Sequence, residues 1–152
     1  MNFAAGFTPE AQAAFQFAAD IWNSLLVTTV PIVINATFNS AGNPFNLGSA
    51  GPETFFLIGG SAIPVGLVNQ LVGFDANGAD PEINANFNSD RTDWYFGTDG
   101  NVPSGKVDFV SVVLHEIGHG LGFVSSDAFS SGTGSFSNPP IKFDTFIENG
   151  AN

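Results

Sequence analysis

Cysteine is absent from this sequence of 152 residues. Without thiols the chain has no disulfide scaffold, no thiolate zinc site and no cysteine nucleophile. Long apolar segments are also missing, because no hydrophobic run reaches the ~18 residues that a membrane-spanning helix requires. We therefore expect no membrane insertion. Met1 leads directly into "NFAAGFTPEA", which lacks the charged and apolar regions of a signal peptide.

Basic residues are scarce. Arg91, Lys106 and Lys142 are the three basic side chains against 14 Asp and Glu, and the formal net charge is −11. A chain this acidic offers no phosphate-binding surface, so nucleic acid and anionic membranes are poor partners.

Hydrophobic residues are abundant. They make up 43% of the chain and include 17 Phe, which is enough for a packed core. The length fits one domain. Gly, Asn and Ser fill the segments between apolar runs, so we expect a loop-rich fold with many turns.

Two helices are predicted from capping residues and apolar spacing. Residues 7–26 begin with Thr8 as N-cap and Pro9 in the first helical position. Residues 106–122 contain an apolar stripe, and the glycines at 120 and 122 are expected to end that helix. A shorter helix is expected at 64–73.

The predicted strands are rich in β-branched residues or alternate in polarity. Residues 28–38 form the first, with Pro31 indicating an edge or a bulged start. In the strand at 83–89, Ile83, Ala85 and Phe87 face one way and the asparagines face the other. We expect it to be an edge strand. A short strand is expected at 54–60, and loops are expected at 39–54, 75–82, 90–105 and 125–140.

The segment "VVLHEIGHGLGF" contains both histidines of the chain, His115 and His119, with Glu116 between them. Residues four apart on a helix share one face, so two imidazoles can reach a single zinc ion. Zinc lowers the pKa of a bound water, and the adjacent glutamate takes that proton and returns it to the leaving amine. The pattern HExxH therefore predicts a zinc site with His115 and His119 as ligands and Glu116 as catalytic base and acid. The alternative is an ordinary polar patch on an amphipathic helix.

"HEIGHGLGF" resembles the zincin metallopeptidases, in particular metzincins, whose pattern is HExxHxxGxxH. His115, Glu116, His119 and Gly122 match that pattern, whereas Ser125 stands at the last ligand position. Together with "VPIVINATF", "DWYFGTDG" and "KFDTFIENG", the segment is similar to a bacterial family of predicted secreted, leishmanolysin-like zinc metallopeptidases. The resemblance implies an α+β zincin-like fold, in which an N-terminal helix lies on a small mixed sheet and an active-site helix carries HExxH.

The same resemblance implies a secreted zinc endopeptidase that acts on protein or peptide substrates. It also implies that residues 1–152 are the N-terminal part of a longer catalytic domain, with the third histidine beyond Asn152. Within the chain, Asp144, Asp127 and Ser125 are alternative third ligands, although Asp144 also fits a capping role. The loop at 75–82 has alternating oxygen ligands but is more typical of a solvated turn than of a calcium site.

Two other functions remain open at this point. The first is a zincin-like module for binding or adhesion, in which an incomplete zinc site is inactive. The second is a metal-dependent hydrolase of another bond, such as an amidase. In the peptidase hypothesis, the strand at 83–89 adds an extended peptide as an antiparallel neighbour.

Overall fold

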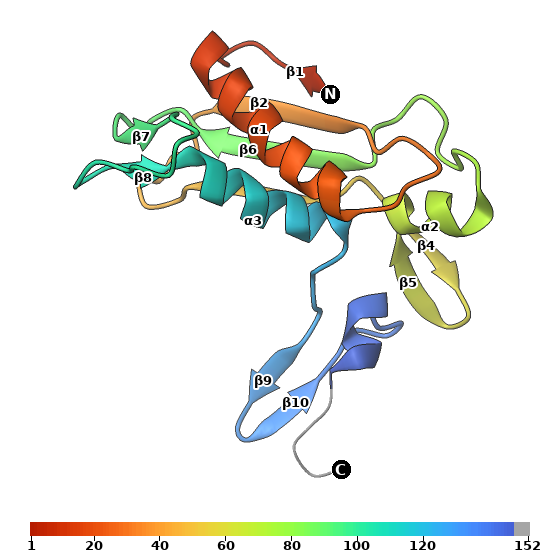
Figure 1. Cartoon of the computed structure of the whole chain (residues 1–152). Coiled ribbons are helices and arrows are strands. Elements are labelled where there is room, and N and C mark those ends of the chain that lie inside the picture. Colours follow the sequence, from red (N-terminus) through yellow and green to blue (C-terminus); the bar gives the residue numbers. More distant parts are fainter. Residues whose placement is uncertain (148–152) are drawn as a thin grey trace.

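The computed structural model describes residues 1–147, which form a mixed α and β fold (Figure 1). Its main sheet has four strands, and the α+β class predicted from the sequence is confirmed. In spatial order these strands are β1 (Asn2–Phe3), β2 (Ile34–Asn39), β6 (Ile83–Asn88) and β3 (Gly48–Pro52).

The sheet is mixed. Strands β1, β2 and β6 run parallel, with Ile34 opposite Ile83 and Asn39 opposite Asn88, while β3 is antiparallel to β6. The prediction that residues 83–89 form an edge strand is wrong, because β6 is paired on both sides. The edge strands are β1 and β3. Strand β3 lies within the segment 39–54, which was expected to contain only turns.

Helix α1 spans Pro9–Leu25 and begins as predicted. The Thr8 side chain accepts a hydrogen bond from the Ala11 backbone N–H, and Pro9 occupies the first turn. Ala11, Ala14, Phe15 and Ala18 are fully buried. The three alanines let the helix lie close to its neighbours, and Phe15 fills the core.

Helix α3 spans Phe109–Leu121, and Asp108 caps its start by accepting from the Ser111 backbone N–H. Gly122 ends it with a φ of 113°, a left-handed conformation that favours glycine. Gly120 has a different role from the predicted one, because it lies inside the helix. A Cβ at that position would stand 2.4 Å from Ile83 Cγ2, so its glycine permits close packing of α3 on β6.

An aromatic cluster joins the two long helices to the sheet. Phe109 lies at its centre, with ring centroids 5.0 Å from Phe87, 5.2 Å from Trp94 and 5.9 Å from Phe38. Phe15 meets Phe87 edge-on at 5.7 Å. Edge-to-face contacts of this kind are favoured by the ring quadrupole, so the N-terminal ends of both helices are held on the sheet.

The remaining elements extend from this core. Strands β4 (Phe55–Ile58) and β5 (Ser61–Pro64) form a hairpin that leads into helix α2 (Val65–Val72), as expected for 54–60 and 64–73. The short strands β7 (Trp94–Tyr95) and β8 (Val107–Asp108) pair in parallel. Beyond α3 lie β9 (Ala128–Ser130), β10 (Thr133–Ser135) and the 3₁₀ helix η1 (Lys142–Phe146).

The segment 125–140 is thus more ordered than predicted, since β9 and β10 form an antiparallel hairpin. Figure 1 shows this hairpin and η1 below α3, joined to it by an extended connection. No helix within residues 1–147 combines the length and hydropathy needed to cross a bilayer.

Two polar side chains are buried against expectation. Asn88, predicted to face solvent, is fully buried, and its Nδ2 donates to the carbonyls of Asn43 and Asn46. Glu82, at the end of the predicted 75–82 loop, accepts hydrogen bonds from the Val33 N–H and the Asn69 side chain. Both hold loops against strand ends, where buried polar groups find partners.

Candidate metal site on helix α3

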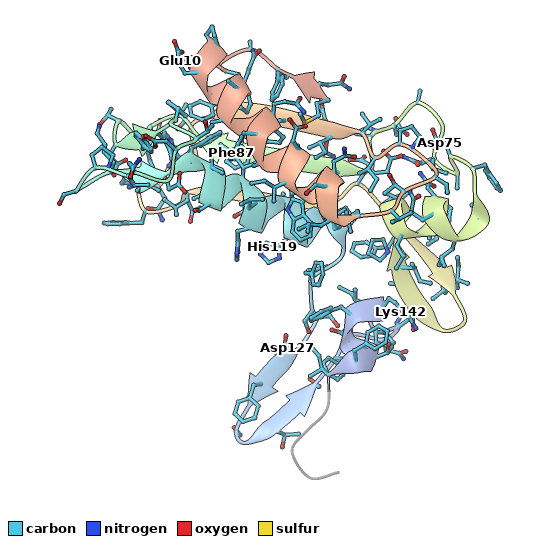
Figure 2. The ribbon with its side chains drawn as sticks, in the orientation of Figure 1. Glu10, Asp75, Phe87, His119, Asp127 and Lys142 are labelled. Carbon is cyan, nitrogen blue, oxygen red and sulfur yellow. The ribbon has the colours of Figure 1, made fainter. Side chains whose placement is uncertain are left out.

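The two histidines and Glu116 lie on α3, and the predicted helix is confirmed. Figure 2 shows His119 on the side of α3 that faces the β9–β10 hairpin and η1. On this side His115 is exposed and His119 is half-buried, whereas Ile117, between them in sequence, is buried in the core. The helix therefore presents both imidazoles to the same open side.

The imidazoles converge on each other. The distance between His115 Nε2 and His119 Nε2 is 3.0 Å, and the ring centroids are 4.6 Å apart. Each Zn–N bond, at ~2.0–2.1 Å, is longer than half of that separation. A single ion can therefore contact both nitrogens, and the pair fits zinc in chemistry and in spacing.

A backbone carbonyl fixes the protonation of His119. Its Nδ1 lies 2.8 Å from the Phe123 carbonyl oxygen. That oxygen can only accept, so Nδ1–H donates, and in the neutral ring the lone pair is on Nε2, which faces His115 Nε2. A hydrogen bond of this kind on the far nitrogen is a common feature of histidines that bind metals.

Glu116 is buried beside the pair. Only 8% of its surface is exposed, and none of the side-chain hydrogen bonds formed within residues 1–147 involves its carboxylate. Its oxygens are not fully enclosed, because Arg91 Nε is the one fully buried side-chain polar atom without a partner within residues 1–147. The Glu116 oxygens are thus available to a water molecule or a substrate.

The described part of the chain contributes no third metal ligand. No group of three or more His, Asp or Glu side chains suited to a metal ion forms within residues 1–147. Ser125 donates to Asp144 Oδ1 at 2.6 Å, and the exposed Asp127 lies in the lower part of the molecule, away from His119 (Figure 2).

Asp144 acts as a clasp rather than a ligand. Its buried carboxylate accepts hydrogen bonds from the Ser125 and Ser126 hydroxyls and from the backbone N–H groups of Ser126 and Ile141. Burial raises the pKa of Asp144, but these hydrogen bonds outweigh that effect and hold it below the ordinary 3.8. The capping interpretation of Asp144 is thus confirmed.

Aromatic side chains support the C-terminal half of α3. Trp22 of α1 donates from Nε1 to the Leu114 carbonyl at 3.0 Å. Its ring lies 6.2 Å from that of Phe123, which in turn lies 6.0 Å from Phe143 of η1. The residue that orients His119 is therefore held between the first helix and the last element described.

Sequence reasoning found the histidines and Glu116 but missed Phe123 and Phe143. Phe123 follows the motif directly, so its position next to the helix end was a usable signal. Phe143 comes from a segment 20 positions further on, and only the path of the loop brings it close.

No curated protein and no solved structure matches the chain. One family model does match, and it covers residues 5–133, which include both long helices and the main sheet except β1. That is more than half of the chain. The chain therefore belongs to the SPBPB7E8-like family.

Proposed function

We propose that the chain is a zincin-like domain and a secreted, zinc-dependent endopeptidase. One observation supports this most strongly. The Nε2 atoms of His115 and His119 converge to 3.0 Å, next to a buried Glu116 whose carboxylate has no protein partner within residues 1–147. The oxygens of that carboxylate are not fully enclosed, so water can reach them. The arrangement is useful for binding a cation and moving a proton.

Each residue has a distinct role in this proposal. His115 and His119 would hold the metal, and the Phe123 carbonyl keeps the His119 proton on Nδ1. Zinc, when bound, supplies a Lewis acid that polarises a carbonyl and lowers the pKa of water. Glu116 takes the proton from the attacking water and delivers it to the leaving amine.

The sheet edge supports a peptide substrate. Within the described strands, β3 pairs only with β6, so its other edge has backbone groups for an extended chain. Helix α3 packs along β3, and Gly48, Ser49, Ala50 and Gly51 carry small side chains or none. We propose that a substrate lies along β3 and is held mainly through its backbone.

An alternative follows from the missing ligand. Catalytic zinc sites usually have three protein ligands and one open position, and residues 1–147 bring together only two. This observation favours a binding module with a weak, inactive metal site. A third ligand from outside the described residues, as the zincin resemblance implies, stays a prediction.

Zinc binding and cleavage of an unstructured protein, measured together, distinguish these functions. We expect the wild type to bind one zinc per chain and to cleave the substrate. Glu116→Ala is expected to keep the zinc and lose about 10²–10⁴-fold in rate, because only the proton transfer is removed. His119→Ala is expected to lose both.

Glu10→Ala, which removes an exposed carboxylate from α1, serves as the matched control and should behave as wild type. Equal cleavage by the Glu116→Ala variant would overturn the peptidase proposal. Zinc binding without cleavage by any form would favour the binding module.

A further inference from the structure

We infer that a groove at the C-terminal end of α3 selects substrates that carry an apolar side chain next to a carboxylate. The inference rests on the proposed function, since it assigns a substrate class to the same site. It is based on an apolar cavity, its position beside the histidines and the cation at its rim.

The cavity has a volume of about 160 Å³ and is lined mainly by apolar groups. Its walls come from three parts of the chain: the β5–α2 junction, the end of α3 and η1. The main lining residues are Pro64, Leu67, Phe123, Lys142, Phe143 and Phe146. A space of this size accommodates one medium-sized side chain, and its apolar walls favour a hydrocarbon.

The groove adjoins the metal site through Phe123, although neither histidine lines it. Gly122 and Phe123 line it, and the Phe123 carbonyl accepts the hydrogen bond from His119 Nδ1. A peptide bound at His119 therefore has a neighbouring side chain within reach of the groove. Gly122 is also tightly packed, since a Cβ there would lie 3.0 Å from Pro64 Cγ.

The far wall of the groove is fixed in two ways. Ile141 forms a parallel bridge with Ala62 of β5, and the Ala62 N–H donates to the Pro140 carbonyl at 2.8 Å. The Asp144 clasp ties η1 to Ser125 and Ser126, just after the helix. Because both ends are anchored, the groove is pre-formed, and binding need not order it.

Lys142 gives the groove its charge preference. Its ammonium lies 5.2 Å from the centroid of the Phe146 ring, and no carboxylate within residues 1–147 forms an ion pair with it. The other two basic side chains are engaged away from the groove: Arg91 pairs with Asp93, and Lys106 donates to the Thr92 carbonyl. In a chain of net charge −11, a cation at this rim favours a carboxylate beside the buried apolar group.

Matched peptides test this inference. The peptides contain Leu-Glu, Leu-Gln, Leu-Lys or Ser-Glu in a common sequence, with each pair in both orders, and kcat/KM is measured for each. We expect the wild type to prefer Leu-Glu over Leu-Lys by about fivefold, as a partly exposed ion pair allows. Lys142→Glu should reverse that preference. The matched control, Lys106→Glu, makes the same charge change elsewhere and should keep it.

The apolar part is tested separately. Phe146→Ser should reduce the preference for Leu-Glu over Ser-Glu. Cleavage with no discrimination, or equal effects of the two lysine variants, would overturn the inference and leave the peptidase proposal standing.

If no peptide is cleaved, the peptidase proposal fails, and fluorescence anisotropy of the labelled peptides decides on the groove. Tighter binding of Leu-Glu that Lys142→Glu abolishes would still support it. Equal binding of all peptides would overturn the inference about the groove.

Discussion

Asp144 illustrates how one buried carboxylate can organise a loop. It is 2% exposed and accepts hydrogen bonds from four donors on three residues. Charge-assisted hydrogen bonds of this kind are stronger than neutral ones. They offset the desolvation of the carboxylate only while it is ionised.

The stability contributed by Asp144 is expected to depend on pH. Its folded pKa lies below the ordinary 3.8, so the contribution is fully present above that value. It is lost as the pH falls through the lower folded pKa, where the carboxyl protonates in both states. Asp144→Asn should cost about 1–3 kcal/mol at pH 7, because one oxygen becomes an N–H group facing donors.

Urea denaturation at a series of pH values measures this difference. The difference in the free energy of unfolding between the wild type and Asp144→Asn should become smaller below pH 3.8. Asp127→Asn, which alters a nearby exposed carboxylate, is the control and should have little effect. A difference that is constant down to low pH would contradict the clasp.

At the scale of elements, the packing of α3 depends on the glycines of its last turns. Gly118 and Gly120 both lie inside the helix, but their surroundings differ. A Cβ at Gly118 would meet Trp22 Cζ2 at 3.6 Å, an ordinary contact, whereas one at Gly120 would overlap the side chain of Ile83.

Alanine at these two positions should therefore have opposite effects. Gly118→Ala should stabilise the protein by about 0.5–1 kcal/mol, since alanine favours the helix. Gly120→Ala gains the same preference but forces α3 away from β6, and we expect a net loss of about 1–2 kcal/mol. Thermal unfolding of the two variants provides the measurement. A stabilised Gly120→Ala variant would show that the helix is free to move.

Capping and periodicity predicted the helices well. Thr8 with Pro9 marked the start of α1, and Gly122 marked the end of α3, so local chemistry alone identified two of the four ends. The strands were harder, because pairing joins distant segments. The sequence of β3, "GSAGP", is typical of a turn, and it is a strand only because β6 provides its partner.

In the candidate site, too, local features could be predicted from the sequence and long-range contacts could not. His115, Glu116 and His119 lie within one helical turn or so, so their spacing alone predicted their convergence. The clasp at Asp144 and the groove at Lys142 depend on how residues 123–141 return to the helix. No periodicity encodes that path. The prediction that Asn88 faces solvent was wrong for a similar reason, because the loop at residues 41–46 covers it.

At the scale of the whole molecule, acidic side chains far outnumber basic ones. The net charge is −11, and Arg91–Asp93 is the single ion pair formed within residues 1–147. Most carboxylates within residues 1–147 therefore have no cationic partner. Their mutual repulsion opposes the compact state.

Added salt is therefore expected to stabilise the fold. Raising NaCl from about 10 mM to about 150 mM shortens the Debye length from about 30 Å to about 8 Å and screens this repulsion. We expect the Tm to rise in metal-free buffer, as measured by circular dichroism. A Tm that falls with salt would mean that attractive pairs dominate instead.

The anchoring of the β9–β10 hairpin has a consequence for how this chain can vary. Ser126 binds both Asp144 and the Ser137 N–H, so the two stems of the hairpin are tied together at its base. All residues of both strands are exposed. The contacts at the base do not involve the residues of the tip. Lengthening an exposed loop also has a small entropic cost. The tip is thus a place where relatives could lengthen, shorten or exchange sequence while the helix end and the histidines keep their geometry.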